Sequence, residues 1–214
     1  MTMRIAKVCV GGPTSINVDG KTVHTGIFKS RVEGSVEVKS FNLAGDGQAD
    51  LTVHGGRDKA IYAYSQEHYL YWAKELGVDA LEDAQFGENL TVAGLSENEV
   101  VIGDSYKMGT AIVTVTQPRL PCFKLGIRMG DKSFPKRFLD SGRLGMYLRV
   151  VEEGALQCGD TIDLIDRPGH GITLHDLWRT IFHNDGDAQL ALEHLPHLDA
   201  GWLRRLRRNS ATDQ

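Results

Sequence analysis

The chain has 214 residues, of which 41% are hydrophobic, and its 24 Lys and Arg against 28 Asp and Glu give a net charge of −4. This length and composition suffice for one substantial hydrophobic core and exclude a natively disordered chain. The small negative charge provides no overall attraction to nucleic acid, so any anionic ligand must be held by a local group of Lys and Arg.

The cysteines indicate the compartment. The chain has three cysteines, and no two of them form a Cys-x-x-Cys pair. This pattern excludes a disulfide framework and is typical of a reducing cytoplasm. No stretch approaches the ~18 apolar residues of a bilayer-spanning helix, and the N-terminus lacks an apolar leader. We therefore expect a cytoplasmic protein with neither a membrane nor a nucleic-acid partner.

Strand-like runs dominate the first three quarters of the chain, where β-branched residues alternate with glycine-containing turns. The predicted strands cover residues 4–10, 22–28, 35–41, 59–64, 88–93, 111–116, 144–151 and 160–165. Many short strands with few helices between them favour a curled sheet or a barrel, because closure removes exposed strand edges. The predicted fold is therefore β-rich, of the α+β class, with a β-barrel core and peripheral helices.

Helical patterns interrupt the strands and then replace them. Ser65 is placed to cap a helix over residues 66–76, and Gly77 is placed to end it in a left-handed conformation. Further helices are predicted at 122–129 and 134–141, from Thr173 onward, and at about 187–195 and 199–208. The change of pattern divides the chain into residues 1–168 and a small C-terminal three-helix appendage at residues 169–214.

The last predicted helix ends in a basic run, Arg204-Arg205-Leu206-Arg207-Arg208. A contact with RNA or with an acidic partner is one interpretation of this run. The simpler interpretation is a solvated helix face, whose cations are favourable near the C-terminal end of a helix dipole.

One thiol has unusual sequence neighbours. Cys122 lies within residues 117–124, Gln-Pro-Arg-Leu-Pro-Cys-Phe-Lys, directly after a predicted strand, where binding groups commonly collect. The two prolines stiffen the backbone before it, and Arg119 and Lys124 favour a thiolate. The alternative is that a single cysteine is a small apolar filler, an interpretation that suits Cys9 well.

Two other segments, residues 46–59 and 86–90, carry polar residues that a core does not need. In the first, a glycine pair lets backbone N–H groups approach a ligand, and Arg57 and Lys59 are suited to neutralise phosphate oxygens. The P-loop pattern is absent, and a plain surface turn explains the spacing equally well.

His54 precedes the glycine pair. No HExxH motif or close histidine pair indicates a zinc site. His54 with Cys122 and either Asp58 or Glu88 would suit a thiol hydrolase, in which histidine is the base and the carboxylate orients it. Nothing in the sequence brings these residues together.

Taken in order, these motifs resemble the MOSC-domain family, whose domains are of the molybdenum-cofactor-sulfurase C-terminal type. The resemblance spans roughly residues 25–165 and rests on His54-Gly55-Gly56, Asp58-Lys59-Ala60, Phe86-Gly87-Glu88-Asn89-Leu90, Pro118-Arg119 and Pro121-Cys122-Phe123-Lys124. The helical tail is similar to that of the YiiM-like subgroup, which is associated with resistance to 6-hydroxylaminopurine. Each motif alone is modest, but together they are specific.

The resemblance implies a MOSC-type β-barrel and a pterin-based molybdenum cofactor whose metal is bound by a cysteine thiolate, for which Cys122 is the matching position. His54 is the second catalytic candidate. The implied cofactor or substrate pocket is lined by Lys29, Ser30, Arg31, Gly55, Gly56, Arg57, Lys59, Asn89, Arg119, Lys124 and Arg143. Cations and glycine backbone would hold the pterin phosphate, and the cofactor would do the redox chemistry.

The implied activity is the reduction of N-hydroxylated compounds, such as 6-hydroxylaminopurine, to amines, which detoxifies base analogues. The chain has no GxGxxG motif and too few cysteines for a cluster held by four thiolates, so we expect a separate electron-donating reductase, by the resemblance a flavoprotein. The helical appendage is a candidate docking or homodimer surface. The alternatives are a persulfide carrier acting through Cys122 and a cofactor-free thiol hydrolase or binding module.

Overall fold

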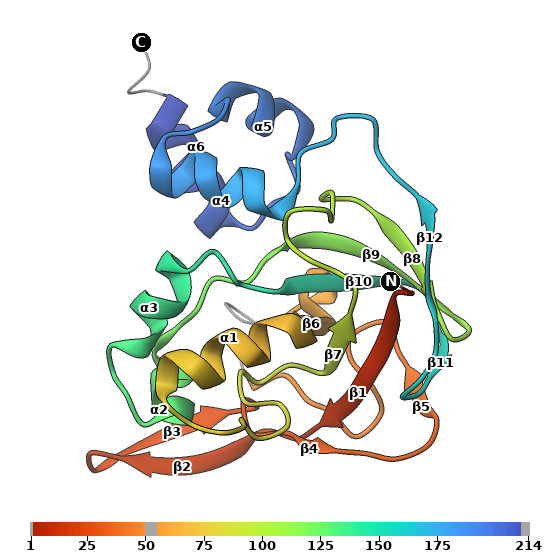
Figure 1. Cartoon of the computed structure of the whole chain (residues 1–214), viewed down its shortest axis with the longest axis vertical. Helices are drawn as coiled ribbons and strands as arrows, with labels where there is room; N and C mark the ends of the chain where they lie inside the picture. The colour runs from red at the N-terminus through yellow and green to blue at the C-terminus, as the bar shows by residue number, and fades with distance from the viewer. Residues whose placement is uncertain (1, 50–54, 211–214) are drawn as a thin grey trace.

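An eight-stranded sheet in the order β12-β8-β9-β10-β6-β7-β1-β4 forms the centre of the fold in the computed structural model, which describes residues 2–49 and 55–210 (Figure 1). Its strands are β1 Arg4–Val10, β4 Ser30–Arg31, β6 Ile61–Ser65, β7 Leu90–Ala93, β8 Ser105–Met108, β9 Ala111–Pro118, β10 Met146–Glu152 and β12 Ile162–Asp166. Neighbouring strands are antiparallel except for β6 and β7, which are parallel and are joined through helix α1, as a parallel pair requires a crossover.

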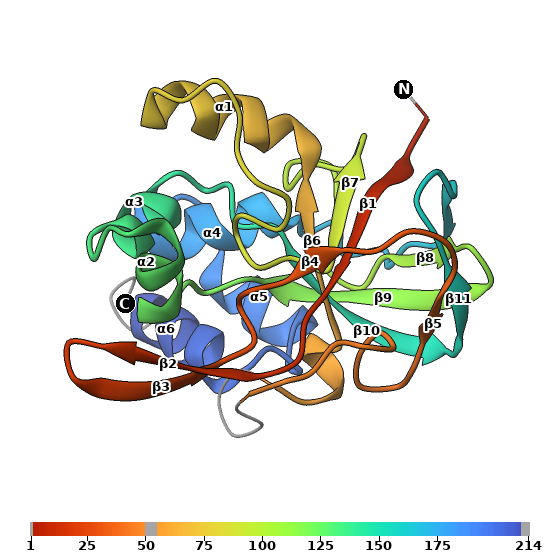
Figure 2. The ribbon, with the colours of Figure 1, turned by 90° about the horizontal axis from the view of Figure 1, so that it is seen from below.

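Two smaller sheets complete the β structure. Strand β5 (Val36–Val38) pairs with β11 (Gly154–Leu156), and β2 (Thr14–Val18) forms a hairpin with β3 (Lys21–Thr25). Asp19 and Gly20, both with positive φ, make the two-residue turn of this hairpin, the sequence that such turns favour. The hairpin extends away from the large sheet in both ribbon views (Figures 1 and 2).

The closed barrel expected from the sequence is not confirmed. Backbone pairing runs as an open order from β12 to β4, although the two ends of the sheet approach each other near β1. There, Ile5 N–H donates to Asp160 O at 2.9 Å, Ile162 N–H donates to Met3 O at 3.0 Å, and Arg4 forms an isolated bridge with Thr161. Among the described residues, no continuous ladder joins β12 to β1. The fold is a mixed α+β fold around a strongly curled sheet.

All eight predicted strands have counterparts, of which β1 matches at both ends and the others have at least one shifted end, whereas β2, β4, β8 and β11 were not predicted. The missed strands are two to five residues long, and β8, although Ser105-Tyr106-Lys107-Met108 alternates polar and apolar residues, is too short for that pattern to stand out. The six predicted helices are confirmed as α1 Gln66–Leu76, α2 Phe123–Met129, α3 Phe134–Asp140, α4 Leu174–His183, α5 Ala188–His194 and α6 Ala200–Ser210.

Helix α1 ends as expected at Gly77 in the left-handed conformation, but its N-cap differs from the expectation. The Ser65 hydroxyl donates to the Glu67 carboxylate instead of accepting a backbone N–H. The buried side of the helix packs into an aromatic cluster in which Trp72 lies 4.9 Å from Phe134 between ring centroids. This cluster fills the space between α1, α3 and the sheet (Figure 1).

The C-terminal helices α4, α5 and α6 gather on one side of the sheet (Figure 1). Trp202 of α6 is fully buried, and its indole N–H donates to the carbonyl of Pro118 at the end of β9 at 3.1 Å. One hydrophobic cluster includes residues of both the sheet and these helices, and the division at residues 168 and 169 stays a prediction. None of the helices in residues 2–49 and 55–210 has the length and apolar character that crossing a membrane requires.

The Trp202 contact predicts a stability effect. Trp202→Ala should lower the free energy of unfolding by about 3–5 kcal/mol, because it removes a large buried side chain and a hydrogen bond. Leu190→Ala, at a position that is 41% exposed on α5, is the matched control and should cost less than about 1 kcal/mol. Urea unfolding followed by circular dichroism measures both, and equal values for the two variants would contradict the importance of this contact.

Candidate functional site

A pocket opens where β9 ends and α2 begins. Cys122, half-buried and in an extended conformation, is the residue directly before α2, as the sequence indicated. Of the residues expected in a cofactor or substrate pocket, Lys29, Lys59, Asn89, Arg119 and Lys124 line this pocket together with Cys122. Segments far apart in the sequence therefore bring four cations and one thiol to the same place.

Arg119 is the most firmly held of these cations. Its side chain is only 7% exposed, its guanidinium donates to the carbonyl of Phe86, and its guanidinium carbon lies 4.6 Å from the centroid of the Tyr62 ring. Gly87, which follows Phe86 in the chain, has a φ of +79°. A Cβ at this position would lie 2.6 Å from a side-chain carbon of Ile27. The glycine therefore allows the turn that directs the Phe86 carbonyl at Arg119.

Asn89 is part of the fold as well as of the pocket wall. Its side-chain carbonyl accepts the N–H of Tyr62 at 3.0 Å, and its side-chain amide donates to the carbonyl of Cys9 at 3.3 Å. The buried side-chain amide of Asn89 thus joins β6 and β1, the strands on either side of β7. A buried amide with both ends satisfied fixes this part of the wall.

Lys29 forms a buried ion pair with Asp46, whose other contact is the N–H of Gly11 at 3.0 Å. The two side chains are only 7% and 4% exposed. Because the pair is shielded from water, removing either partner would leave an uncompensated buried charge, which is strongly destabilising. The positive charge of Lys29 is therefore largely balanced before any ligand arrives.

Lys59 connects the pocket with the C-terminal helices. Its ammonium nitrogen lies 2.9 Å from an oxygen of Asp199 and 5.8 Å from the centroid of the Tyr147 ring. The same Asp199 carboxylate accepts the backbone N–H groups of Gly201 and Trp202 at 2.8 and 3.0 Å, so it caps α6. The side-chain amide of Gln117 donates to it at 2.9 Å.

Asp199, Gln117 and Tyr147 were not predicted as site residues from the sequence. An aspartate before a helical pattern is an N-cap signal, which indicates where α6 starts. That signal gives no information about a partner 140 positions earlier in the chain, since such pairing depends on the tertiary fold.

Residues Gly55, Gly56 and Arg57 line a second hollow beside the first. Lys59, Leu120 and Tyr147 line both hollows, so the two adjoin. His54 lies outside the described residues.

Three of the expected residues do not line either hollow. Ser30 and Arg31 form the exposed strand β4, where the Nε of Arg31 lies 2.9 Å from an oxygen of Glu33. The Arg143 guanidinium stacks at 3.8 Å from the centroid of the Tyr71 ring. A role for these three residues in the pocket stays a prediction.

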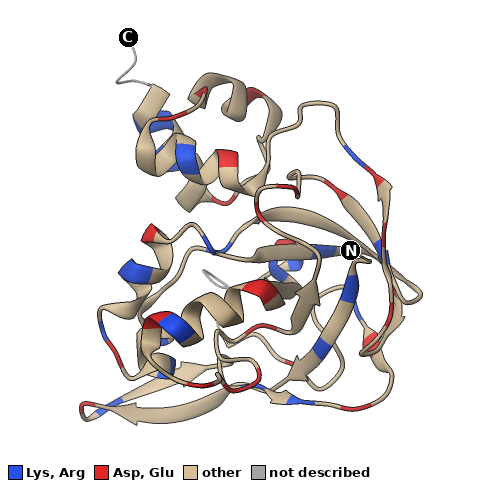
Figure 3. Cartoon of the chain, viewed as in Figure 1, with Lys and Arg blue, Asp and Glu red and all other residues tan. Residues whose placement is uncertain are grey.

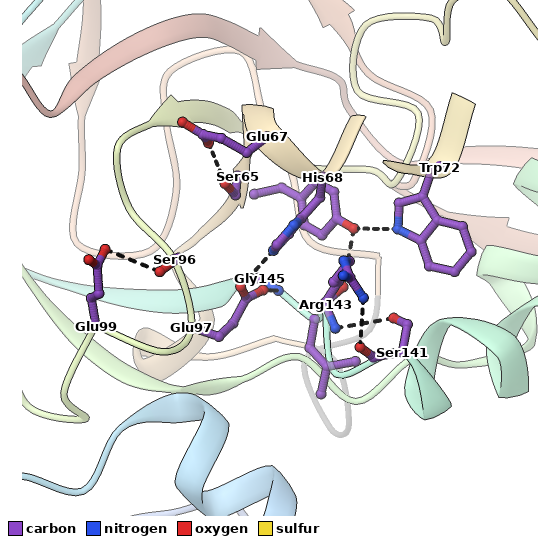
Figure 4. A network of polar contacts seen from close by, with 12 residues as sticks. Ser65, Glu67, His68, Trp72, Ser96, Glu97, Glu99, Ser141, Arg143 and Gly145 are labelled. Atoms are coloured by element: carbon purple, nitrogen blue, oxygen red, sulfur yellow. Dashed lines mark hydrogen bonds and ion pairs between the residues drawn. The ribbon is translucent and has the colours of Figure 1, made fainter. Parts of the chain in front are cut away.

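Arg143 belongs instead to a separate polar network under α1 (Figure 4). Its carbonyl accepts the Tyr64 hydroxyl at 3.1 Å, and that hydroxyl accepts the Trp72 indole N–H at 2.8 Å. In the same network, His68 lies 2.6 Å from the buried Glu97 carboxylate. Burial opposes the charge of Glu97, but the contact with His68 and the N–H of Gly145 hold its pKa below its usual range.

The hydrolase alternative requires a carboxylate to orient a base, and both candidates have other partners. Glu88 is fully buried and accepts the hydroxyls of Tyr69 and Thr91, and burial raises its pKa. Asp58 pairs with Arg149 at 2.5 Å.

The other two cysteines differ from Cys122. Cys9 is fully buried in β1, and burial raises the pKa of its thiol to about 12. It is the apolar filler expected from the sequence. Cys158 donates its S–H to the carbonyl of Ala6 at 3.0 Å. Cys122 is the one cysteine of the described chain that lines the cation-rich pocket.

Comparisons with known proteins identify the family of the chain. The profile of the MOSC domain matches residues 50–163. The chain is 42% identical to the uncharacterized protein YflK of Bacillus subtilis (strain 168), over 82% of this chain and 79% of that protein. It is 32% identical to protein YiiM of Escherichia coli (strain K12), over 85% of this chain and 83% of that protein.

A solved structure and a more distant relative extend the comparison. The crystal structure of YiiM from Geobacillus stearothermophilus superimposes with a TM-score of 0.78 at 32% identity, covering 97% of this chain and 98% of that one. A protein of Gibberella moniliformis named reductase is 36% identical over 70% of this chain, which spans only 27% of that protein. The chain belongs to the MOSC domain family. Within that family it is a YiiM-like protein.

Asp199 predicts a pH dependence of stability. Although burial opposes its charge, hydrogen bonds from Lys59 and the N–H of Trp202 hold its pKa below its usual range. A carboxyl group with a lowered folded-state pKa stabilises the fold above its unfolded pKa of about 3.9, and this contribution is lost as the pH falls through the folded-state value. Asp199→Asn should therefore cost about 1–2 kcal/mol near pH 7 and progressively less below about pH 4.

Urea unfolding of wild type and Asp199→Asn between pH 3 and pH 7 measures this difference. Asp163→Asn, on the exposed part of β12, is the matched control and should change stability little at any pH. A difference between wild type and Asp199→Asn that stayed constant down to pH 3 would contradict the charge interaction with Lys59.

Proposed function

We propose that the chain binds a molybdenum–pterin cofactor in the Cys122 pocket and reduces N-hydroxylated compounds to amines. The observation that carries this proposal is a thiol in a pocket lined by four cations, in a chain of the MOSC family. A soft sulfur ligand suits a metal held by a sulfur-containing cofactor, and the cations suit a phosphate.

The donor set agrees with a metal delivered by a cofactor. Residues 2–49 and 55–210 contain no group of three or more His, Cys, Asp or Glu side chains that would hold a metal ion. A metal at Cys122 would therefore take most of its ligands from the cofactor, with one from the protein. The residues present fit such a group.

The pocket side chains have separate roles in this proposal. Cys122 would bind the metal, and the fixed charge of Arg119 would favour the thiolate form of a neighbouring sulfur. Lys124 would contact the pterin phosphate, whereas Lys59 is held by Asp199 in the wall of the pocket. Lys29 is balanced by Asp46, so its part would be to hold the wall of the pocket.

The reaction converts R–NHOH, two electrons and two protons into R–NH₂ and water. The cofactor, when bound, supplies the two-electron chemistry that removes the hydroxyl oxygen. Tyr147, which lines both hollows, would hold a proton for the product. Burial raises the pKa of Tyr147, so its hydroxyl stays protonated at neutral pH.

The electrons must come from outside the chain. A separate electron-donating reductase is therefore part of the proposal, and the substrate is a small N-hydroxylated molecule. Detoxification of base analogues is the proposed biological use, in agreement with the sequence resemblance.

The first test is the molybdenum content and the hydroxylamine-reducing activity of wild type and Cys122→Ala, purified from a host that makes the cofactor. Wild type should contain nearly one molybdenum per chain and should reduce 6-hydroxylaminopurine with a supplied electron donor. Cys122→Ala should lose its activity by at least about 100-fold, because a metal ligand is removed, and most of its metal.

Cys158→Ala is the matched control, since that half-buried thiol lies outside the pocket, and it should retain both metal and activity. Metal-free wild type with cyanide-labile sulfur on Cys122 would contradict the proposal and favour a persulfide carrier. Hydrolytic activity in a cofactor-deficient host would favour thiol chemistry without molybdenum.

A further inference from the structure

The hollow beside the Cys122 pocket is large and basic, and the proposed reduction at Cys122 gives no role to its arginines. Its volume is about 510 Å³, within the range of about 300–1,000 Å³ that is typical of small-molecule sites. Its wall includes Arg57 and, from α6, Arg204 and Arg205. Basic segments lie along the C-terminal helices that cover this side of the sheet (Figure 3).

The arginines of the basic run, residues 204–208, lie on different faces of helix α6. Residues four apart on a helix share a face, so Arg204 and Arg205 lie over Ala200 and Gly201, and all four line the hollow. Arg207 is exposed and does not line it. The first two arginines of the run therefore belong to a site, whereas the sequence favoured a solvated face for the whole run.

The charges in the hollow are unevenly balanced. Lys59 is paired with Asp199 at 2.9 Å, and Asp58 is paired with Arg149 at 2.5 Å. No carboxylate among the described residues lies within ion-pair distance of Arg57, Arg204 or Arg205. Arg205 donates to the carbonyl of Gly201 at 3.0 Å, which leaves most of its guanidinium donors available. Three guanidinium groups thus surround the hollow with a net positive charge.

The hollow continues into the Cys122 pocket. Lys59, Leu120 and Tyr147 form the wall between them, and Leu120 is two residues before Cys122. The first turn of α6 packs closely against this wall. A Cβ on Gly201 would lie only 3.1 Å from a side-chain carbon of Leu120. A ligand in the hollow can therefore extend one end toward Cys122.

We propose that Arg57, Arg204 and Arg205 form a phosphate subsite, so that the preferred substrate is the nucleoside monophosphate of an N-hydroxylated base, with its base toward Cys122. Guanidinium groups bind phosphate through pairs of parallel hydrogen bonds, which suits three of them around one hollow. The substrate class rests on the proposed reductase activity, whereas binding of the phosphate does not.

Binding is tested first, because it needs no turnover. Holoprotein from a cofactor-producing host is titrated by calorimetry at low salt with adenosine 5′-monophosphate, adenosine and inorganic phosphate. The variants are Arg204→Gln/Arg205→Gln, which removes both charges but keeps polar, unbranched side chains, and Arg207→Gln, the matched control on the exposed side of the same helix. Circular dichroism and molybdenum content are measured for each.

Wild type should bind the monophosphate at least tenfold more tightly than adenosine or phosphate, and the double variant should lose about tenfold of this affinity. Arg207→Gln should stay within twofold of wild type, and all the proteins should contain equal molybdenum. In turnover, the ratio of kcat/KM for the N-hydroxylated monophosphate over the free base should fall about tenfold in the double variant, mainly through KM.

Four outcomes would overturn the subsite. In the first two, wild type binds adenosine or inorganic phosphate as tightly as the monophosphate. In the third, the double variant loses its molybdenum. In the fourth, Arg207→Gln has an effect as large as that of the double variant. Loss of molybdenum would assign the arginines to the cofactor's own phosphate, and an equal effect of Arg207→Gln would indicate a diffuse nucleic-acid surface. Arginine-dependent binding without any reduction of hydroxylamines would support the subsite and reject the proposed reductase activity.

Discussion

The Asp199 carboxylate is the interaction on which the site depends. Its two oxygens cap α6, accept the side-chain amide of Gln117 at the end of β9 and pair with Lys59 in the pocket wall. A helix cap alone is worth about 1 kcal/mol, but here the same group also fixes the position of a pocket cation. Loss of this carboxylate would therefore disturb the helix and the pocket together.

The other pocket cations are also held by the fold before any ligand binds. Arg119 is fixed by the Phe86 carbonyl and the Tyr62 ring, and Lys29 is fixed by Asp46. Burying three cations near one another is unfavourable unless each has a compensating group. Lys29 and Lys59 each have an aspartate carboxylate, and Arg119 has a carbonyl and an aromatic ring. This arrangement orders the side chains in advance, so that less conformational entropy is lost when an anion binds.

The sequence predicts local structure better than it predicts the site. Periodicity and turn residues located all eight predicted strands and six helices, because these signals depend on neighbours along the chain. Motif order grouped Cys122, Lys59 and Arg119, and these three residues line one pocket, whose role stays a prediction. Tyr147 and Asp199 were missed, because their roles arise only when β10 and α6 pack beside β9. Sheet closure was overestimated for the same reason, since it depends on whether the ends of β12 and β1 pair.

The C-terminal helices are therefore part of the site, although the sequence indicates a separate appendage. Without α6, Lys59 would lose its carboxylate partner, and the carbonyl of Pro118 would lose the Trp202 indole N–H. Pro118 lies within five residues of Cys122 in the chain, and Lys59 is part of the wall of the Cys122 pocket. The loop between β9 and α2 supplies the thiol, and the C-terminal helices contribute charged residues to the walls of the two hollows beside it. Variation in the helical tail of such proteins should therefore alter which substrates reach the cysteine more than it alters the chemistry at the cysteine itself.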